Sequence, residues 1–191
     1  MKKIILASAS PRRIQLLEQI GLHAEVHPSR IEERVTSIEP EAVVQELAIQ
    51  KASDVASRIF AKENVGDADT VVIGADTVVS IDGRILGKPK THAEAAEMIH
   101  ALSGRTHEVY TGVAIISPAK KLCFSEMAAV EVYPLSEDEI REYAESDEPM
   151  DKAGAYGIQG VFGKFVKGIR GDYNTIVGLP VARLFQELKN I

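Results

Sequence analysis

Two short apolar runs in the first half of the chain predict buried strands that end at polar residues. Residues 4–7 read Ile-Ile-Leu-Ala and are followed by Ser8, and residues 71–73 read Val-Val-Ile and stand three positions before Asp76. Continuous apolar runs of this length are typical of strands that are buried on both faces. We therefore expect strands at residues 3–7 and 70–81, with a shorter one at about 24–27.

Helical periodicity and capping residues predict helices between these strands. The clearest case is residues 40–60, where Val43, Leu47, Val55 and Ile59 form an apolar stripe. Other helices are marked by their first residues, either a proline that follows a serine or a capping box. We expect these helices at residues 11–20, 91–102 and 136–145, and from about residue 180.

Turn signals between strand-like segments predict two hairpins. Asp82-Gly83 leads into residues 84–86, and Ser117-Pro118 joins residues 107–116 to residues 121–133. Because helices alternate with strands and hairpins also occur, the sequence predicts an α/β fold with a mixed sheet flanked by helices. Residues 154–163 contain four glycines, and we expect a flexible stretch there that approaches a ligand closely.

The length and the net charge of the chain limit its domain organisation and the kinds of partner that it can bind. With 191 residues the chain can form one domain or two small lobes around a cleft. We expect a single domain, 1–191, with a possible smaller lobe at about 105–150. The net charge of −6 argues against a protein that binds the backbone of a nucleic-acid polymer. A small polyanion needs only a local basic pocket and stays compatible with this charge.

The sequence also predicts the compartment. Cys123 is the single cysteine, so no internal disulfide can form and a reducing compartment is expected. No apolar stretch approaches membrane-spanning length, and the apolar run after Met1-Lys2-Lys3 is too short for a signal peptide. We expect a cytoplasmic protein with no membrane partner.

Residues 8–13, which read Ser-Ala-Ser-Pro-Arg-Arg, suggest a site for phosphate groups. They connect a buried strand to the start of a helix, where unpaired backbone N–H groups point outward. The planar guanidinium groups of Arg12 and Arg13 can each pair with two phosphate oxygens. The alternative is a capped surface helix with two solvated arginines, and residue types alone do not separate the two interpretations.

Four further residues could complete a site for phosphate chemistry. Asp76 at a strand end and Glu33 in a polar loop could hold a divalent cation or accept a proton from water, while Lys51 and Lys88 could neutralise phosphate charge. Each has an ordinary alternative: a turn-capping Asp, a solvated loop Glu, and surface lysines. Gly87-Lys88 is followed by Pro89, so no P-loop is present, and HExxH, paired CxxC and GxSxG motifs are absent.

Several blocks together resemble the Maf family of nucleoside triphosphate pyrophosphatases, in family order and over essentially the whole chain. The resemblance implies an α/β fold with two lobes around a deep cleft, related to the inosine triphosphatase-like pyrophosphatases. The blocks are residues 7–13 (ASASPRR), 74–77 (GADT), 87–89 (GKP), 102–104 (LSG), 151–160 (DKAGAYGIQG) and 178–180 (GLP).

The resemblance also implies an activity and roles for individual residues. The implied reaction is hydrolysis of dTTP and UTP to the monophosphate and pyrophosphate with a divalent metal, Mg²⁺ or Mn²⁺, and 5-modified uridine triphosphates are further candidate substrates. By the family pattern Asp76 corresponds to the proton acceptor. Our hypothesis for the metal is that Glu33 and Asp76 are its ligands. The positions that line the phosphate and metal site in the family are matched here by Ser8, Arg12, Arg13, Glu33, Lys51 and Lys88. The positions tied to substrate choice are matched by Arg12, Thr77 and Gln159.

The chemistry of Gln159 agrees with this branch of the family, because a Gln amide offers a donor and an acceptor in one plane, as a uracil or thymine edge requires. Two alternatives stay open at this point: a pyrophosphatase for modified purines such as 7-methyl-GTP, and a nucleotide-binding regulator of septum formation. A homodimer is the commonest closed assembly and is considered possible here, although no exposed apolar stripe marks an interface.

Overall fold

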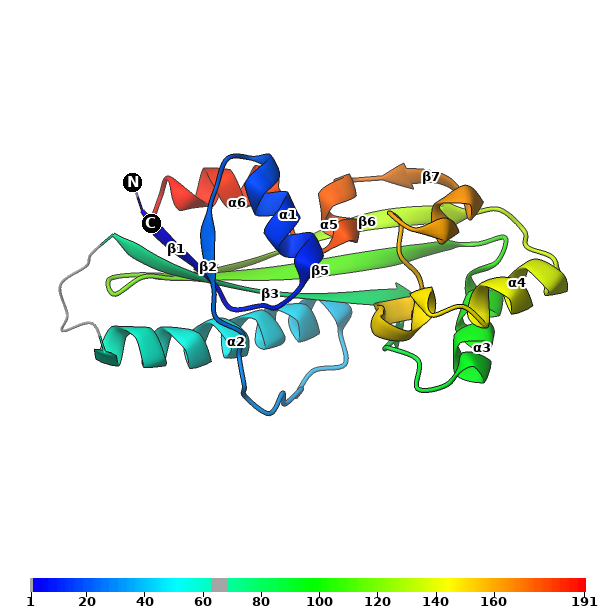
Figure 1. Ribbon diagram of the computed structural model, residues 1–191, viewed down its shortest axis with the longest axis horizontal. Coiled ribbons are helices and arrows are strands. Elements are labelled where there is room, and N and C mark those ends of the chain that lie inside the picture. Colours follow the sequence, from blue (N-terminus) through cyan, green and yellow to red (C-terminus); the bar gives the residue numbers. More distant parts are fainter. Residues whose placement is uncertain (1, 63–68) are drawn as a thin grey trace. The chain divides into compact units, whose positions relative to one another are not determined.

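The computed structural model describes residues 2–62 and 69–191 and has a mixed α/β architecture (Figure 1). Within those residues seven strands form one sheet in the order β2-β1-β3-β5-β6-β7, with β4 paired to β3. The strands are β1 (Lys3–Leu6), β2 (Ala24–Val26), β3 (Thr70–Ile81), β4 (Arg84–Leu86), β5 (Thr106–Ile116), β6 (Lys121–Val132) and β7 (Val166–Arg170). The α-helices are α1 (Pro11–Gln19), α2 (Pro40–Lys62), α3 (His92–Leu102), α4 (Glu137–Ala144), α5 (Tyr173–Val177) and α6 (Val181–Leu188).

The directions of the strands confirm the predicted mixed sheet. Strand β1 pairs in parallel with both β2 and β3, and its register with β3 aligns Ile4 with Val71 and Leu6 with Ile73. Strand β4 pairs antiparallel with β3, and β7 pairs antiparallel with β6. The predicted apolar runs therefore lie side by side in the sheet, which explains why both are continuous.

The chain forms two compact units, and β3, β5 and β6 contribute residues to both. Unit 1 comprises the described residues of Met1–Asp76, with Thr111–Glu126 and Gly178–Ile191. Unit 2 comprises Thr77–Tyr110 and Met127–Val177. The single domain 1–191 with a smaller lobe at about 105–150 stays a prediction.

Unit 1 is built in layers. Helix α2 lies on one side of the strands, and α1 and α6 lie on the other side (Figure 1). The core under α2 combines apolar side chains from three strands with the small residues Ala48, Ala52 and Ala56 of the helix. Cys123 of β6 packs against this core and is partly buried, as expected for a small residue in a strand.

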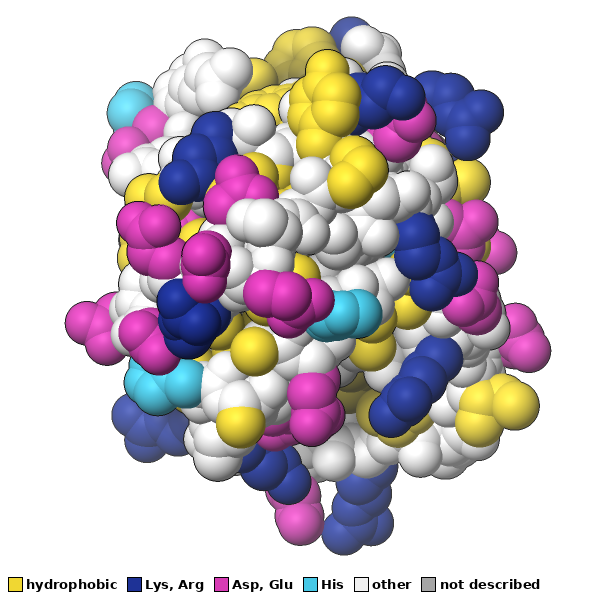
Figure 2. Space-filling model, turned by 90° about the vertical axis from the view of Figure 1, so that its right-hand side faces the viewer, with side chains coloured by type: hydrophobic (Ala, Val, Ile, Leu, Met, Phe, Trp, Pro, Cys, Tyr) yellow, Lys and Arg dark blue, Asp and Glu magenta, His cyan; other side chains and the backbone are white. Residues whose placement is uncertain are grey.

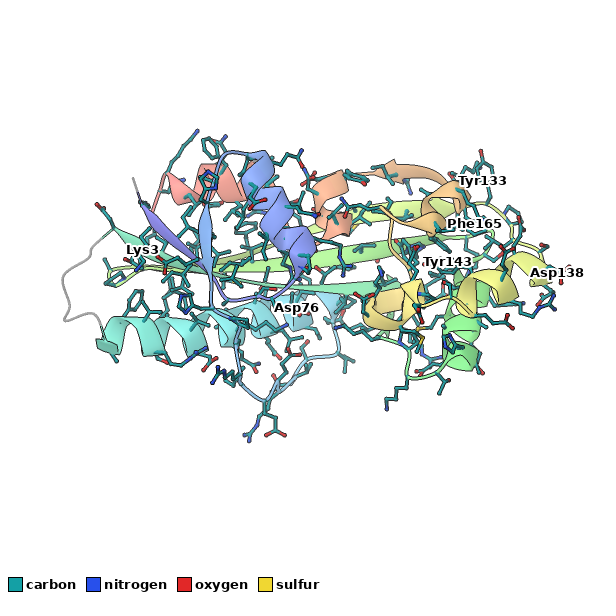
Figure 3. All side chains as sticks on the ribbon, in the orientation of Figure 1. Lys3, Asp76, Tyr133, Asp138, Tyr143 and Phe165 are labelled. Carbon is teal, nitrogen blue, oxygen red and sulfur yellow. The ribbon has the colours of Figure 1, made fainter. Side chains whose placement is uncertain are left out.

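Unit 2 has a core centred on aromatic residues. The rings of Tyr143, Tyr156 and Phe165 each lie within 6 Å, centroid to centroid, of the fully buried ring of Phe162. Figure 3 labels Tyr143 and Phe165 in this unit. His107 also lies in the core, where Tyr156 Oη is 2.7 Å from its Nε2, and burial lowers the pKa of this imidazole to about 4.

Some local predictions differ from the structure. Strand β7 and the short helix α5 were not expected, and α2 extends to Lys62 rather than ending at about residue 60. Residues 153–155 and 161–165 of the glycine-rich stretch form short 3-10 helices, and Phe162 within it is fully buried. The capping box of α4 is confirmed. In α3 Thr91 Oγ1 accepts the predicted hydrogen bond from Glu94 N, but the Glu94 carboxylate accepts from Lys90 N and not from Thr91 N.

The surface carries charges of both signs. On the face shown in Figure 2, Lys and Arg side chains are interspersed with Asp and Glu side chains. Arg105 Nη2, for example, donates to both carboxylate oxygens of Asp82 at 2.7 Å, and both side chains are exposed. Among the residues that the structure describes, no helix is both long enough and apolar enough to span a membrane.

Candidate active site

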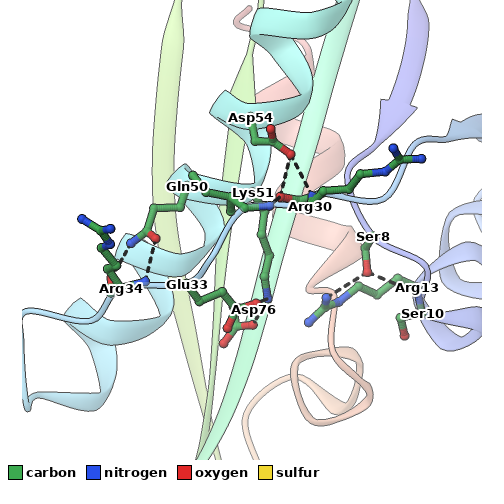
Figure 4. Close-up of polar contacts among 12 residues, drawn as sticks. Ser8, Ser10, Arg13, Arg30, Glu33, Arg34, Gln50, Lys51, Asp54 and Asp76 are labelled. Atoms are coloured by element: carbon green, nitrogen blue, oxygen red, sulfur yellow. Dashed lines mark hydrogen bonds and ion pairs between the residues drawn. The ribbon is translucent and has the colours of Figure 1, made fainter.

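Three of the predicted site residues meet in unit 1 at Asp76, which lies inside β3 and not at a strand end as predicted, because the strand continues to Ile81. The ammonium group of Lys51, on α2, donates a hydrogen bond to Asp76 Oδ1 and lies 3.0 Å from Glu33 Oε1 (Figure 4). The side chains of Lys51 and Asp76 are each 15% exposed, and that of Glu33 is 49% exposed. The ammonium group of Lys51 therefore contacts two carboxylates, one from a loop (Glu33) and one from a strand (Asp76).

Small residues bring α2 close enough to β3 for this contact. A Cβ on Gly74 would lie 2.4 Å from Ala48 O and 2.7 Å from Ala52 N, far inside normal contact distances. A Cβ on Gly112, in the β5 segment of unit 1, would lie 2.3 Å from the carbonyl oxygen of Val44. The backbone of α2 thus rests directly on the backbone of the sheet, and Lys51 reaches Asp76 from this position.

The loop that carries Glu33 is fastened to α2 by three side chains one helical turn apart. Asp54 Oδ2 accepts hydrogen bonds from Arg30 N and Ser29 Oγ, both at 2.9 Å, and these bonds, chiefly the one from the Arg30 backbone, lower the pKa of Asp54. Gln50 exchanges two hydrogen bonds with the backbone of Arg34, at 3.0 and 2.6 Å (Figure 4).

The third side chain of α2 that binds the Glu33 loop is Glu46. Its carboxylate accepts hydrogen bonds from Thr36 N at 2.9 Å and from Thr36 Oγ1 at 2.6 Å. These bonds, chiefly the one from the hydroxyl, lower the pKa of Glu46. Because residues 46, 50 and 54 are spaced by four, they project from one face of the helix. Glu33 is therefore held between anchor points on both sides, at Arg30 and at Arg34 and Thr36.

The predicted phosphate segment at the start of α1 is also in unit 1. Arg13 donates a hydrogen bond from Nη1 to Ser8 Oγ at 3.1 Å (Figure 4) and another from Nε to Gly178 O at 2.8 Å. Ser10 occupies the N-cap position without a side-chain capping bond, and its backbone N–H donates to Ser8 Oγ at 3.3 Å. The Ser8 hydroxyl thus links the strand end to the guanidinium group.

Electrostatic interactions connect this segment with the carboxylates. Burial lowers the pKa of Arg13, and the positive charge of Arg12 lowers it further, whereas the negative charges of Asp76 and Glu33 act in the opposite direction. Two neighbouring guanidinium groups and two carboxylates thus act on one another within unit 1. Such a set offers positive charge to an anion and oxygen ligands to a cation in the same region.

The other three predicted residues belong to unit 2. Thr77 follows Asp76 in β3, so the two side chains point to opposite faces of the strand. Lys88 lies between β4 and α3 and is exposed, and its neighbour Gly87 accepts a hydrogen bond from Gly154 N at 3.0 Å. Gln159 is exposed in the segment between Ala155 and Val161.

Sequence reasoning missed the residues that hold these segments in place. The period of four in Glu46, Gln50 and Asp54, away from the apolar stripe of the same helix, was a usable signal for a polar face that binds a loop. Glu148 accepts a backbone hydrogen bond from Val161, and no spacing rule would have indicated this contact.

Known proteins resemble this chain over nearly its whole length. Residues 3–191 match the family described as "Maf-like protein". A protein of Agathobacter rectalis named "dTTP/UTP pyrophosphatase" is 53% identical over 201 residues, covering 100% of this chain and 98% of that protein. Proteins with the same name from Bacillus cereus and Bacillus anthracis are 53% and 52% identical over 190 residues, covering 99% of this chain and 95% of each relative. The chain therefore belongs to the Maf family.

Proposed function

We infer that this protein is a nucleoside triphosphate pyrophosphatase that hydrolyses dTTP and UTP to the monophosphate and pyrophosphate. The observation that carries the inference is the full-length similarity, at 53% identity, to proteins named dTTP/UTP pyrophosphatase. The cluster in unit 1 supports the reaction class, because it combines guanidinium and ammonium groups for phosphate oxygens with a carboxylate that can accept a proton.

A divalent metal fits the residues present. Glu33 and Asp76 both direct an oxygen at the Lys51 ammonium, so the two carboxylates converge on one cationic position. Two carboxylates completed by substrate phosphates are a common ligand set for Mg²⁺, and Mn²⁺ accepts the same oxygen ligands. We propose that Glu33 and Asp76 hold this ion, which when bound supplies positive charge to the triphosphate.

The roles of the protein groups follow from their chemistry. Water attacks the α-phosphorus, and Asp76 accepts the proton from the water. The cationic groups of Arg12, Arg13, Lys51 and Lys88 stabilise the charge that develops on the departing pyrophosphate, and the Ser8 hydroxyl orients Arg13 toward it. Because a tight metal ligand is a poor base, one of the two roles given to Asp76 can belong to Glu33.

We propose that base recognition involves Arg12, Thr77 and Gln159. The amide of Gln159 can accept a hydrogen bond from the pyrimidine N3–H and donate one to an adjacent carbonyl. Adenine and cytosine present no ring N–H beside a carbonyl and leave these polar groups unpaired, which disfavours ATP and CTP. The exposure of Gln159 is consistent with a side chain that is accessible to a ligand.

We also propose a cytoplasmic location and a homodimeric assembly. The lone Cys123 is half-buried, and burial raises the pKa of its thiol to about 11, so it stays protonated and inert as expected of a structural cysteine. A homodimer is proposed only because it is the commonest closed assembly. Neither a nucleic-acid polymer nor a membrane is proposed as a partner.

The test is a chromatographic product assay over natural and modified nucleoside triphosphates with Mg²⁺ or Mn²⁺. We expect monophosphate and pyrophosphate, formed fastest from UTP and dTTP. Diphosphate with orthophosphate would show attack at the γ-phosphorus and refute the proposed reaction. Equal rates for all four ribonucleotides would refute the base assignment, a preference for 7-methyl-GTP would favour the modified-purine branch, and binding without any product would favour a regulator.

A further inference from the structure

The carboxylate of Glu148 holds the segment that carries Gln159. Glu148 opens a 3-10 helix (Glu148–Asp151) in unit 2, and its Oε2 accepts a hydrogen bond from Val161 N at 2.8 Å. Its Oε1 accepts hydrogen bonds from Tyr143 Oη at 3.0 Å and from Phe162 N at 3.4 Å. A charged acceptor thus binds two successive backbone N–H groups immediately after the segment of Gln159, and a buried tyrosine fixes its orientation.

Two glycines let the segment close over Glu148. A Cβ on Gly160 would lie 2.2 Å from Glu148 Oε1, and a Cβ on Gly157 would lie 2.8 Å from Lys152 Cε. Lys152 in turn donates a hydrogen bond from Nζ to Glu148 O at 2.6 Å. The backbone on both sides of Gln159 therefore packs against the side chains of Glu148 and Lys152, which an added Cβ at either glycine would displace.

The Gln159 side chain itself stays exposed while its backbone is fixed. Gly160 N also donates a hydrogen bond to Gly157 O at 3.0 Å, which closes a turn around Ile158 and Gln159. A side chain at the tip of a turn that is anchored on both flanks can be presented to a ligand in few orientations. Such pre-organisation improves binding because less freedom is lost when the ligand arrives.

We propose that Glu148 is a positioning residue for base selection, which acts by fixing the turn that presents Gln159 to the pyrimidine. This inference rests on the proposed function, since it requires Gln159 to contact the base. A purely structural role for Glu148 would affect every substrate alike. A positioning role affects only substrates that carry a base.

The test compares Glu148→Gln with wild type on UTP and on ribose 5-triphosphate, which has the triphosphate but no base. In Glu148→Gln one carboxylate oxygen becomes an NH₂ group, which cannot accept a hydrogen bond from Val161 N or Tyr143 Oη. We expect KM for UTP to rise on the order of 10-fold or more, as for a misplaced binding group, while kcat/KM for ribose 5-triphosphate changes less than about twofold. Glu142→Gln removes an exposed carboxylate from α4 of the same unit and is the matched control.

Amide hydrogen exchange at Val161 and Phe162 gives a readout that is independent of activity. We expect faster exchange at both positions in Glu148→Gln and wild-type rates in Glu142→Gln. An equal loss on both substrates, or faster exchange with unchanged UTP kinetics, would overturn the positioning role. If the wild-type protein releases no monophosphate from UTP, the proposed function itself has failed, and the proposal fails with it.

Discussion

Replacing Gly74 by alanine tests whether the close contact between α2 and β3 sets the geometry of the site. The added methyl group would lie 2.4 Å from Ala48 O, where ordinary contact begins at about 3.4 Å. Ala48 O and Ala52 N, which would lie 2.7 Å away, are both backbone atoms of α2, so neither can rotate away to make room. The helix has to move by roughly 1 Å, or the strand has to bend by a similar amount.

The size of the effect follows from this displacement. Overpacking of this kind typically lowers the free energy of unfolding by about 1–3 kcal/mol. For a chain of this length, each kcal/mol lost lowers Tm by about 2–4 °C. The rate of UTP hydrolysis should also fall, because α2 carries Lys51 and the side chains that anchor the Glu33 loop. A misplacement of about 1 Å in a catalytic set can cost on the order of 10²-fold in rate.

Gly168→Ala is the matched control. Gly168 also lies in a strand, at a position where an added Cβ meets nothing within 4 Å. The two variants are compared by thermal unfolding and by kcat/KM for UTP. If Gly74→Ala is as stable and as active as Gly168→Ala, the contact between helix and strand does not set the site, and the argument above is wrong.

The remaining predictions concern a proton acceptor, a loop anchor and a buried imidazole. Asp76→Asn should abolish UTP hydrolysis and leave the circular dichroism spectrum unchanged; a rate near wild type would exclude Asp76 as the base. Gln50→Ala should release the Glu33 loop and weaken binding of Mn²⁺, by on the order of 10-fold as for an outer-shell contact, when titrated by electron paramagnetic resonance; unchanged affinity would refute the anchoring. Because burial lowers the pKa of His107 to about 4, below its value near 6.5 in the unfolded chain, the unfolded chain binds this proton more tightly. The neutral form of His107 therefore contributes about 3 kcal/mol to stability above pH 6.5, and this contribution is lost as the pH falls toward 4. Over this range Tm of wild type should drop more steeply than Tm of His107→Gln. Parallel curves of Tm against pH for the two proteins would disprove this pH dependence.

Much of the fold was predictable from local pattern. The strands at 3–7 and 70–81 and the helix at 40–60 are long or strongly apolar, and the structure confirms them within a few residues. Strand β7 escaped prediction because none of its five residues is fully buried and Lys167 and Arg170 interrupt its apolar pattern. Helix α5 has five residues, too few for helical periodicity to show.

The site was predictable in its residue types but not in its construction. Residue types and the family resemblance both named Lys51 and Asp76, yet their contact joins residues 25 positions apart and depends on how closely α2 approaches β3. Gly74 carried a signal of this approach, since a glycine inside a buried strand often marks close contact with another backbone. The contact of Glu148 with Val161 depends on tertiary packing, which no local pattern encodes.

The division of the chain into two units has a consequence for its synthesis. The chain passes from one unit to the other four times, at 76/77, 110/111, 126/127 and 177/178. All of unit 2 has been synthesised once residue 177 is complete, whereas unit 1 still lacks residues 178–191, which include α6 and Gly178, the acceptor for Arg13. On the ribosome unit 1 therefore cannot be completed before unit 2, and the phosphate segment acquires its hydrogen bond to Gly178 only after unit 2 has been made.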